Sequence, residues 1–277
     1  MTTKDYENWL DIYLTEKKGQ GLAPASLKGT EYSINKYLKF LGDGFMNKAT
    51  YYEFLNSLTV SPISKKHYAR DLRAFLYWCQ SEELIPSFKV TLPKSQDPVP
   101  KIISEEEANA LLFRYGKSFA EDRMYTIICL IFATGLRSRS IVNIKVEDVD
   151  FANRSICIRE TKSKKTVILP MTDKLYAILN KYVKKWKPAE YLFPSESGTK
   201  LESSGLQSAY KRYARQRGVP YGIHSLRHYY ATEAVRHGMT PFALQRVLGH
   251  SSIDITMKYV NLVNGDLQNE MRKVDIL

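Results

Sequence analysis

The sequence predicts a mainly α-helical protein with a small antiparallel β-sheet, organised as two domains. Apolar residues recur at helical spacing through the first ninety or so residues and again after Pro170. Between these regions, residues 146–170 alternate in the manner of strands. A proline-rich stretch from Pro86 has no periodicity and is typical of an extended linker. We therefore expect a first domain over residues 1–90, a linker over 91–102 and a second domain over 103–277.

The first domain is expected to be entirely helical. Each apolar stripe follows the period of 3.6 residues, and glycine, serine or proline stands near its ends. The expected helices cover residues 4–17, 27–41, 50–58 and 64–78.

The second domain is expected to combine helices with a three-stranded meander. Ser104 and Glu107 have the spacing of a capping box and begin a helix, and a long apolar helix ends at Gly135. Short polar segments separate the strand-like runs, which favours antiparallel pairing. The expected strands are 146–151, 155–159 and 166–170, and the expected helices are 124–134, 175–183, 204–215, 225–237 and 241–248.

The charge balance favours a polyanionic partner. The chain has 41 Lys and Arg against 29 Asp and Glu, a formal net charge of +12. Such an excess suits a nucleic acid, because each neutralised phosphate releases condensed counterions. A basic protein that binds no nucleic acid is the alternative, and charge alone does not decide between them.

Cysteine usage and hydropathy argue against several other classes. The three cysteines, Cys79, Cys129 and Cys157, are scattered without metal-ligand spacing, so no zinc site is expected. The N-terminus lacks the apolar core of a signal peptide, and the longest apolar run, residues 127–133, is too short to span a bilayer. We therefore expect a cytoplasmic, nucleoid-associated protein without a membrane contact.

Six side chains able to handle a phosphodiester occur along the second domain. An arginine guanidinium binds phosphate through two parallel hydrogen bonds and keeps its charge. Residues three apart on a helix share a face, so a histidine and an arginine at that spacing can converge on one anion. Each residue alone has an ordinary interpretation as a surface, helix-end or core residue, since the chain holds 19 tyrosines and many cations. The six are Arg137, Lys162, His224, Arg227, His250 and Tyr259.

The order of the segments that carry these residues is distinctive. T-G-L-R ends at Arg137, a basic turn between two expected strands holds Lys162, H-S-L-R-H starts at His224, and L-G-H-S-S-I-D-I-T-M-K-Y ends at Tyr259. This arrangement resembles the tyrosine recombinase, or phage integrase, family over the whole chain. The resemblance implies a DNA clamp made of a helical SAM-like core-binding domain and a catalytic domain. The compact plan is similar to that of Xer-type recombinases.

The resemblance also implies roles for these residues. Arg137, Lys162, His224, Arg227 and His250 would surround the scissile phosphate, and Tyr259 would attack it to give a 3′-phosphotyrosyl enzyme. We expect His224 to take or share the phenol proton and Lys162 to protonate the departing 5′ oxygen. Two arginines would stabilise the transition-state charge, so no cofactor and no metal are expected.

One position departs from the family pattern. An acidic residue usually stands three residues after the first arginine, where this chain has Ser140 in L-R-S-R-S. Ser140 can form a hydrogen bond but cannot neutralise a cation, and Arg139 adds a further positive charge. Arg139 is also the rival of Arg137 for the first arginine position, but the T-G-L-R register favours Arg137.

Additional basic residues are expected to contact DNA outside the catalytic centre. A helix N-terminus attracts phosphate, which favours the basic start of the helix expected at residues 64–78. The expected DNA-binding residues are Lys65, Lys66, Arg70, Lys164 and Lys165.

The expected partner is a double-stranded DNA recombination site. The family resemblance implies a homo-tetramer on synapsed DNA and strand exchange through a Holliday junction, with the amphipathic tail around Leu267 and Met271 docking onto a neighbouring subunit. The resemblance is also compatible with a monomer in the free state and with accessory proteins. Xer-type resolution and integration or excision of a mobile element both remain open. Type IB topoisomerase-like relaxation and a non-catalytic DNA-binding protein of the same fold are the alternatives.

Overall fold

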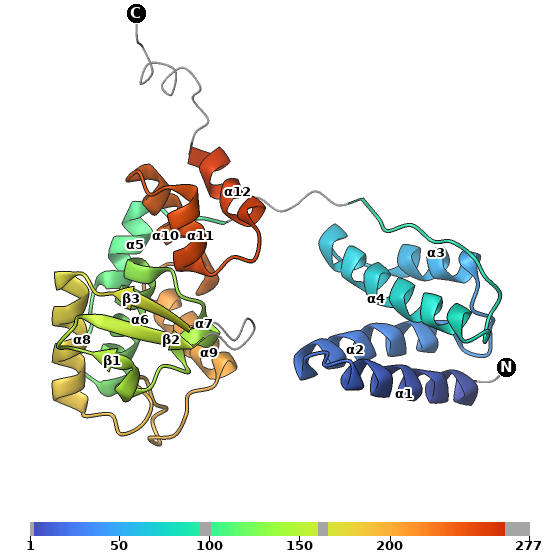
Figure 1. Cartoon of the computed structure of the whole chain (residues 1–277), viewed down its shortest axis with the longest axis horizontal. Helices are drawn as coiled ribbons and strands as arrows, with labels where there is room; N and C mark the ends of the chain where they lie inside the picture. Colours follow the sequence, from blue (N-terminus) through green and yellow to red (C-terminus); the bar gives the residue numbers. More distant parts are fainter. Residues whose placement is uncertain (1–2, 95–100, 160–165, 264–277) are drawn as a thin grey trace, which may run out of the picture. The chain divides into compact units, whose positions relative to one another are not determined.

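The computed structural model describes residues 3–94, 101–159 and 166–263. The chain forms two compact units, residues 1–99 and 100–277, and each has a hydrophobic core of its own. The described residues are mainly helical and carry one three-stranded antiparallel sheet (Figure 1), which confirms the predicted fold class. No helix among the residues described is long and apolar enough to cross a bilayer.

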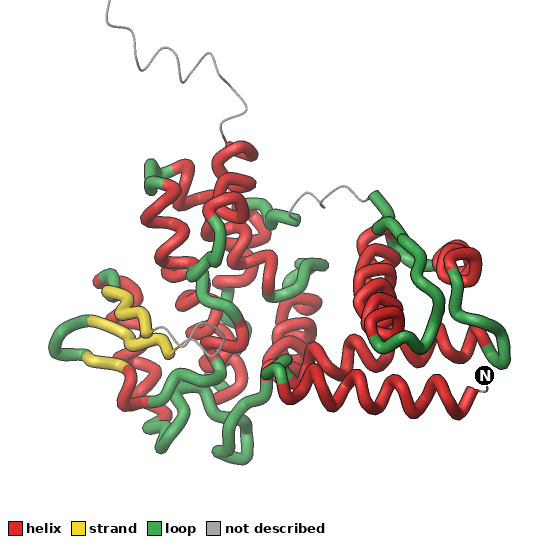
Figure 2. The backbone as a smooth tube through the Cα atoms, turned by 45° about the vertical axis from the view of Figure 1, so that its right-hand side comes forward, coloured by secondary structure: helices red, strands yellow, loops and turns green. Residues whose placement is uncertain are grey.

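The first unit is built from helices alone. Helices α1 and α2 run side by side, and α4 packs against both (Figure 2). Aromatic side chains such as Tyr6, Tyr37 and Phe75 fill the space between the helices and are inaccessible to solvent. The helices are α1 (Thr3–Gly19), α2 (Pro24–Leu41), α3 (Lys48–Ser57) and α4 (Pro62–Ser81).

Three of these helices begin about two residues earlier than predicted. Pro24 and Pro62 occupy the first turns of α2 and α4, where proline fits because those N–H groups have no partner within the helix. Helix α3 starts after Asn47, whose side chain accepts hydrogen bonds from the backbone N–H groups of Ala49 and Thr50. These local caps set the boundaries that hydrophobic periodicity alone does not define.

The chain that follows α4 is extended but stays attached to the first unit. Val90 is buried in the core, and its carbonyl accepts a hydrogen bond of 3.2 Å from the Tyr77 hydroxyl. The backbone N–H of Thr91 donates to the Tyr52 hydroxyl at 3.0 Å. The proline-rich stretch from Pro86 is therefore attached to the helices at Val90 and Thr91, where the linker was expected to begin.

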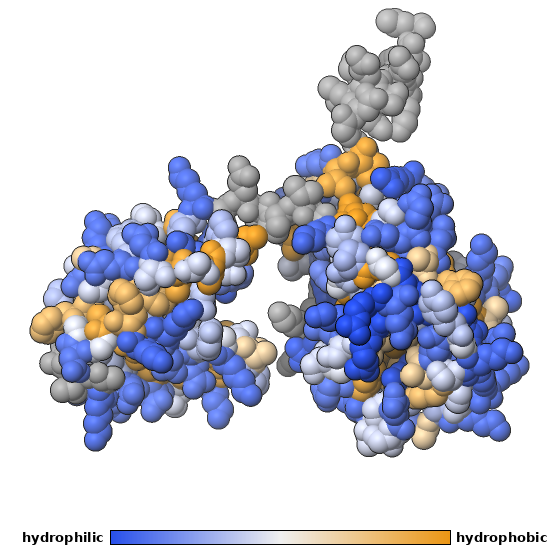
Figure 3. Space-filling model, turned by 180° about the vertical axis from the view of Figure 1, so that it is seen from behind, coloured by the Kyte–Doolittle hydropathy of each residue, from blue (hydrophilic) through white to orange (hydrophobic). Residues whose placement is uncertain are grey.

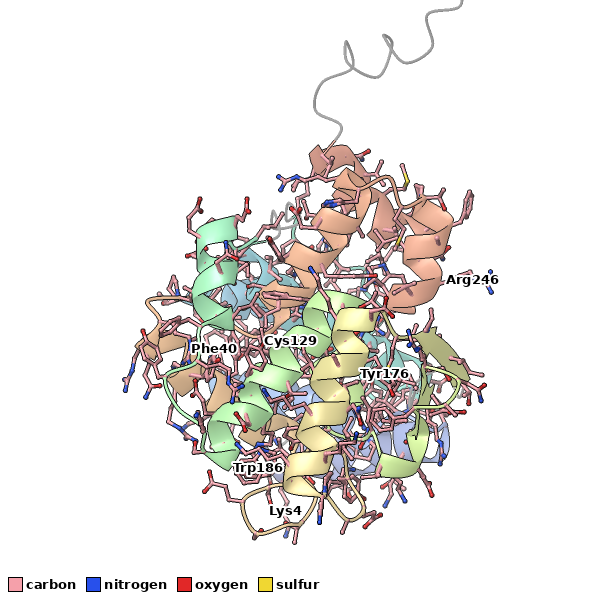
Figure 4. All side chains as sticks on the ribbon, turned by 90° about the vertical axis from the view of Figure 1, so that its left-hand side faces the viewer. Lys4, Phe40, Cys129, Tyr176, Trp186 and Arg246 are labelled. Carbon is pink, nitrogen blue, oxygen red and sulfur yellow. The ribbon has the colours of Figure 1, made fainter. Side chains whose placement is uncertain are left out.

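The second unit places its sheet against a helical layer. Helices α6 and α8, which carry Cys129 and Trp186, lie side by side (Figure 4). Ile156 of the sheet and Leu179 of α8 are inaccessible in a common core. The elements are α5 (Glu105–Leu112), α6 (Phe119–Thr134), α7 (Ser138–Ile141), η1 (Val146–Asp148), β1 (Val149–Asp150), β2 (Ser155–Arg159), β3 (Thr166–Pro170), α8 (Asp173–Trp186), α9 (Ser203–Gln216), α10 (His224–Arg236), α11 (Pro241–Leu248) and α12 (Ile253–Val263).

The sheet has the order β1-β2-β3 and pairs antiparallel throughout, with Ile156 opposite Val149 and opposite Leu169. The first strand is shorter than predicted, because residues 146–148 form a 3₁₀ turn. The carboxylate of Asp148 accepts the backbone N–H of Lys145 at 2.9 Å and pairs with Arg159 at 2.8 Å, which holds this turn in place. Only Val149 and Asp150 are left to pair with β2.

The prediction missed two helices that frame the functional residues. Helix α7 is a short turn directly after Arg137, and α12 carries Tyr259. Helices α10, α11 and α12 pack together around a small core that includes Leu248 and Tyr259. Tyr259 is therefore placed by the packing of three helices.

Candidate active site

The first arginine of the predicted site sits at a sharp change in chain direction. Helix α6 ends at Gly135, which adopts the left-handed conformation with φ of 63°. Leu136 is buried, and Arg137 precedes α7 with extended backbone angles. The Nη2 atom of Arg137 donates to the carbonyl oxygen of Gly249 at 3.1 Å. The guanidinium is thus anchored against the segment that follows α11.

The second arginine is almost completely buried. Arg227, in the first turn of α10, is 3% exposed. Its Nη1 atom donates to the Gly135 carbonyl at 2.7 Å and its Nη2 atom to the Leu248 carbonyl at 2.8 Å. Arg137 and Arg227 therefore bond to the carbonyls of two successive residues, Gly249 and Leu248. Guanidiniums from two separate elements converge at one point.

This convergence depends on a close approach of helices at Gly135. A Cβ atom placed there would lie 2.4 Å from Cδ1 of Tyr230 and 2.6 Å from Cδ2 of Leu248. The glycine is required both by its positive φ and by these neighbours. The packing of Tyr230 and Leu248 thus explains why the T-G-L-R segment has a glycine at this position.

The Tyr259 phenol lies beside two histidine rings. Its hydroxyl forms a hydrogen bond of 2.7 Å with Nδ1 of His228. The ring of His250 is nearly parallel to that of Tyr259, with an interplanar angle of 11° and centroids 6.3 Å apart. His250 uses its own Nδ1 for a 2.9 Å hydrogen bond with the Thr256 hydroxyl. Tyr259 is only 4% exposed, so the phenol is held inside the protein.

Electrostatics keep all three site histidines neutral at pH 7. Burial lowers the pKa of His228 and of His250 to about 4, and nearby positive charge, including Arg227, adds to the effect. Burial and then Arg227 and Arg137 lower the pKa of His224. Burial raises the pKa of the Tyr259 phenol, while Arg227 and Arg137 oppose that rise. The site therefore combines fixed positive charge with neutral imidazoles and a neutral phenol.

The structure brings together five of the six predicted catalytic residues. Arg137, His224, Arg227, His250 and Tyr259 all belong to this cluster, as their contacts and mutual electrostatic influence show. The sixth, Lys162, lies outside the described residues, together with the DNA-binding candidates Lys164 and Lys165. Arg139, the rival of Arg137, is exposed in the short helix α7.

Sequence reasoning did not place His228 beside the Tyr259 phenol. It expected His224 to share the phenol proton, whereas the described hydrogen bond of Tyr259 is to His228, one turn further along α10. The rings of His224 and His228 touch edge to face, with their centroids 4.6 Å apart. The spacing of four residues between the two histidines, on the same helix face, was the signal that could have identified the second one.

The basic candidates of the first unit lie at the start of α4. Lys65 and Lys66 are in its first turns and are half-buried, and Arg70 is exposed. A shallow groove between α2 and α4 is lined by Arg70 and His67, by Tyr68 and Asp71, and by several serine, threonine and glycine residues. The groove is open and holds a carboxylate beside its cationic side chain.

The chain is similar to known tyrosine recombinases and integrases. The model of the phage integrase family matches residues 101–264. Tyrosine recombinase XerA of Saccharolobus solfataricus is 30% identical over 211 residues, which are 76% of this chain and 67% of the relative. Tyrosine recombinase XerA of Thermococcus kodakarensis is 26% identical over 99% of this chain and 95% of the relative. A lambda integrase tetramer bound to a Holliday junction shares the fold, with a TM-score of 0.78 at 16% identity over 91% of this chain and 76% of that chain.

The chain belongs to the phage integrase family. It is a tyrosine-type, Xer-like site-specific recombinase, an enzyme that exchanges DNA strands, as the motifs predicted.

Proposed function

We propose that this recombinase cleaves and rejoins double-stranded DNA through a covalent 3′-phosphotyrosyl intermediate on Tyr259. The observation that carries the proposal is the convergence of Arg137 and Arg227 on the carbonyls of Gly249 and Leu248, beside the buried phenol. A guanidinium carries five N–H donors in a planar fork, and the carbonyl bonds fix the orientation of that fork. Two such groups suit the non-bridging oxygens of one phosphodiester.

In the proposed reaction the Tyr259 phenol gives its proton to a neutral histidine of the site, and its oxygen attacks phosphorus as the bond from phosphorus to the 5′ oxygen breaks. The leaving 5′ oxygen takes a proton from Lys162, and His250 donates a hydrogen bond to the phosphate. The product is a phosphotyrosine and a free 5′-hydroxyl. Attack by the 5′-hydroxyl of a partner strand exchanges one phosphodiester for another, so resealing requires no ATP.

We propose no metal and no cofactor for this chemistry. The extra negative charge of the pentacoordinate transition state is met by Arg137 and Arg227, which remain charged at any working pH. Arg227 is held by two carbonyl bonds in a buried setting, where its field is poorly screened by solvent.

Covalent capture in EDTA and without nucleotide tests the nucleophile and the absence of a metal together. Nicked, fragmented DNA from the source genome is incubated with wild type, Tyr259→Phe and Tyr230→Phe, and SDS-resistant adducts are purified and sequenced. Tyr230 is the matched control because it is a neighbouring tyrosine whose pKa burial also raises. We expect adducts at one recurrent sequence with wild type and Tyr230→Phe, and none with Tyr259→Phe.

Two outcomes would contradict this assignment. An adduct formed by Tyr259→Phe would place the nucleophile on another residue. Loss of the wild-type adduct in EDTA, with recovery on addition of Mg²⁺, would contradict the metal-free mechanism.

We further propose that the first unit, with a domain boundary near residues 91–102, grips the DNA. Its basic contacts would be Lys65, Lys66 and Arg70, assisted in the second unit by Lys164 and Lys165. Support comes from the helix N-terminus at the start of α4 and from the exposed position of Arg70 beside the open groove.

We propose that four protomers assemble on two DNA sites and pass through a Holliday junction. Ile255 and Leu262 are exposed on α12, and Figure 3 shows hydrophobic side chains gathered over the end of this helix. Such a surface is suited to contact with another subunit, and the amphipathic tail around Leu267 and Met271 is the proposed donor. Truncation after Asn264 should abolish synapsis while leaving binding to a single site intact.

The proposed biological role is Xer-type resolution of DNA in the cytoplasm, on the nucleoid, since the two archaeal relatives are named XerA. The genomic position of the captured sequence would distinguish this role from integration of a mobile element. On a plasmid with two sites, relaxation without recombinant products would favour topoisomerase-like activity instead.

A further inference from the structure

We propose that His228, and not His224, accepts the proton of the Tyr259 phenol through its Nδ1 atom during cleavage and returns it during resealing. The proposal rests on the nucleophilic role of Tyr259 put forward above. It assigns a catalytic function to His228, which lies between His224 and Tyr259 of the predicted site.

His228 is placed to take the phenol proton directly. The distance of 2.7 Å between Nδ1 of His228 and the phenol oxygen is that of a good hydrogen bond. The two rings are tilted by 39° with centroids 5.7 Å apart, so the imidazole edge faces the hydroxyl. A proton acceptor must be within hydrogen-bond reach of the proton it takes, and His228 meets that condition before DNA is bound.

The two neighbouring histidines do not occupy this position. His250 is stacked nearly parallel to the phenol ring, and its Nδ1 is already bonded to Thr256. His224 contacts His228 edge to face and lies one helical turn before it, on the side of the two arginines. In this arrangement His228 contacts the phenol, and His224 is the histidine assigned to the phosphate.

The surroundings of His228 keep its ring neutral at pH 7. The groups facing His228 are His224 and Arg227 on its own helix, Tyr259 on α12 and His250 before α12. Burial, His224 and Arg227 lower its pKa to about 4, so the ring is neutral at pH 7. The phenol is neutral too, since burial raises its pKa. With both groups neutral, we take the phenol O–H as the donor and Nδ1 of His228 as the acceptor, which places the ring proton on Nε2.

The proton balance of the proposed step is complete. The phenol oxygen forms its bond to phosphorus as its proton moves to Nδ1 of His228, and the 5′ oxygen leaves with the electron pair of its broken bond and the proton of Lys162. The resulting imidazolium lies next to the bound phosphodiester, whose negative charge offsets the field of Arg227. In resealing, the 5′-hydroxyl gives its proton to Lys162, and His228 returns its proton to the departing phenol oxygen.

The first test observes the tautomer without DNA. In the full-length free protein at pH 7, ¹⁵N NMR of the His228 ring should show Nε2 protonated and Nδ1 as an acceptor, and Tyr259→Phe should shift the Nδ1 resonance. An Nδ1-protonated ring would overturn the proposal, because the phenol would then be the acceptor. This measurement does not depend on whether the protein cleaves DNA.

The second test measures single-turnover adduct formation on a nicked duplex carrying the captured sequence. His228→Ala removes both the hydrogen bond and the proton acceptor, and His228→Asn keeps an acceptor oxygen near the Nδ1 position but cannot take a proton. We expect both variants to bind DNA normally and to form adduct about 100-fold or more slowly at pH 7. The matched control is His237→Asn, at the end of the same helix, whose side chain is 80% exposed.

The pH profile separates proton transfer from a structural role. The wild-type rate should vary little between pH 6 and 8. The rate of both His228 variants should rise by about tenfold per pH unit, since the phenol must then ionise unaided below its pKa, which burial raises. Variants that are slow with a wild-type pH profile would reduce His228 to a structural residue and overturn the proposal.

A change of leaving group distinguishes His228 from Lys162. A substrate with sulfur in place of the bridging 5′ oxygen needs no general acid, because a thiolate leaves readily. It should restore activity to Lys162→Ala but not to His228→Ala. Restoration of both would place His228 on the leaving-group side, and faster cleavage by His228→Ala would make the hydrogen bond an inhibitory latch. Absence of any wild-type adduct would instead reject the proposed nucleophile while the NMR result stands.

Discussion

The Nη2 atom of Arg227 donates a hydrogen bond to the carbonyl oxygen of Leu248, 2.8 Å away, at the end of α11. The Nη1 atom of the same side chain reaches the carbonyl of Gly135, at the end of α6, at 2.7 Å. One buried guanidinium thus connects three chain segments that are far apart in sequence. The cation that is proposed to bind phosphate also holds the walls of its own site together.

Arg227→Lys tests this double role. A lysine ammonium keeps the charge but cannot bond to both carbonyls in the fixed geometry of a guanidinium fork. We expect the free energy of unfolding to fall by about 1–3 kcal/mol, the cost of a lost buried hydrogen bond, and adduct formation to fall by more than tenfold. Urea denaturation and covalent capture measure the two effects.

The control for this substitution is Arg236→Lys on the same helix. Arg236 is exposed and pairs with Glu233, so a lysine there should change neither stability nor cleavage appreciably. Wild-type stability in Arg227→Lys would show that the carbonyl bonds add nothing to the fold.

Gly135→Ala should damage the site through packing. The new Cβ would meet Tyr230 at 2.4 Å and Leu248 at 2.6 Å, and the backbone has a φ of 63° that suits glycine. We expect a loss of about 2–5 kcal/mol in the free energy of unfolding, from backbone strain of about 1–2 kcal/mol and overpacking of about 1–3 kcal/mol. Urea denaturation measures this loss.

Gly198→Ala separates these two contributions. Gly198 has a φ of 81°, but a Cβ atom added to it would meet nothing within 4 Å, so its substitution should cost the backbone strain alone. Equal losses at the two positions would mean that Tyr230 and Leu248 move aside without cost.

The elements that the sequence predicted well are those whose pattern is local. The capping box of Ser104 and Glu107 forms as expected, and the T-G-L-R and H-S-L-R-H segments place Arg137 and Arg227 at element ends. These features depend on spacing and on glycine conformation, which can be read within a few residues.

The elements that were missed depend on tertiary packing. Helix α12 contains the β-branched residues Ile253, Ile255 and Thr256, which have modest helix propensity, and its contacts with α10 and α11 stabilise it. The bond between His228 and Tyr259 joins residues 31 apart and exists only once these helices have packed. Periodicity in one segment cannot reveal it.

Acid should destabilise the protein through the site histidines. Burial first, and then neighbouring positive charge, lowers the pKa of His250 to about 4 from its usual 6.5. The unfolded chain therefore binds more protons than the folded one below pH 6.5. The stability that the neutral ring contributes is complete above that pH and is lost as the pH falls toward 4.

His250→Gln removes one of these titrating groups, so its free energy of unfolding should fall less steeply between pH 6.5 and 4.5 than that of wild type. The exposed His237 is the control, and His237→Gln should keep the wild-type slope. Urea denaturation at several pH values gives the slope of the free energy of unfolding against pH. Carboxylate titration contributes equally to this slope in all variants, so it cancels in the comparison. Identical slopes for all three proteins would show that His250 titrates normally in the folded state.

The basic start of α4 predicts a specific change in the salt dependence of DNA binding. Arg70 is exposed beside the groove between α2 and α4, with only a loose ion pair to Asp71 at 3.6 Å. If Arg70 contacts a phosphate, Arg70→Ala should weaken binding to any duplex and lower the slope of log affinity against log salt by about 1. Fluorescence anisotropy on a duplex of random sequence, over a salt series, measures it. Lys18→Ala, an exposed cation on α1 away from this groove, should keep the wild-type slope, and an unchanged slope in Arg70→Ala would remove Arg70 from the proposed DNA interface.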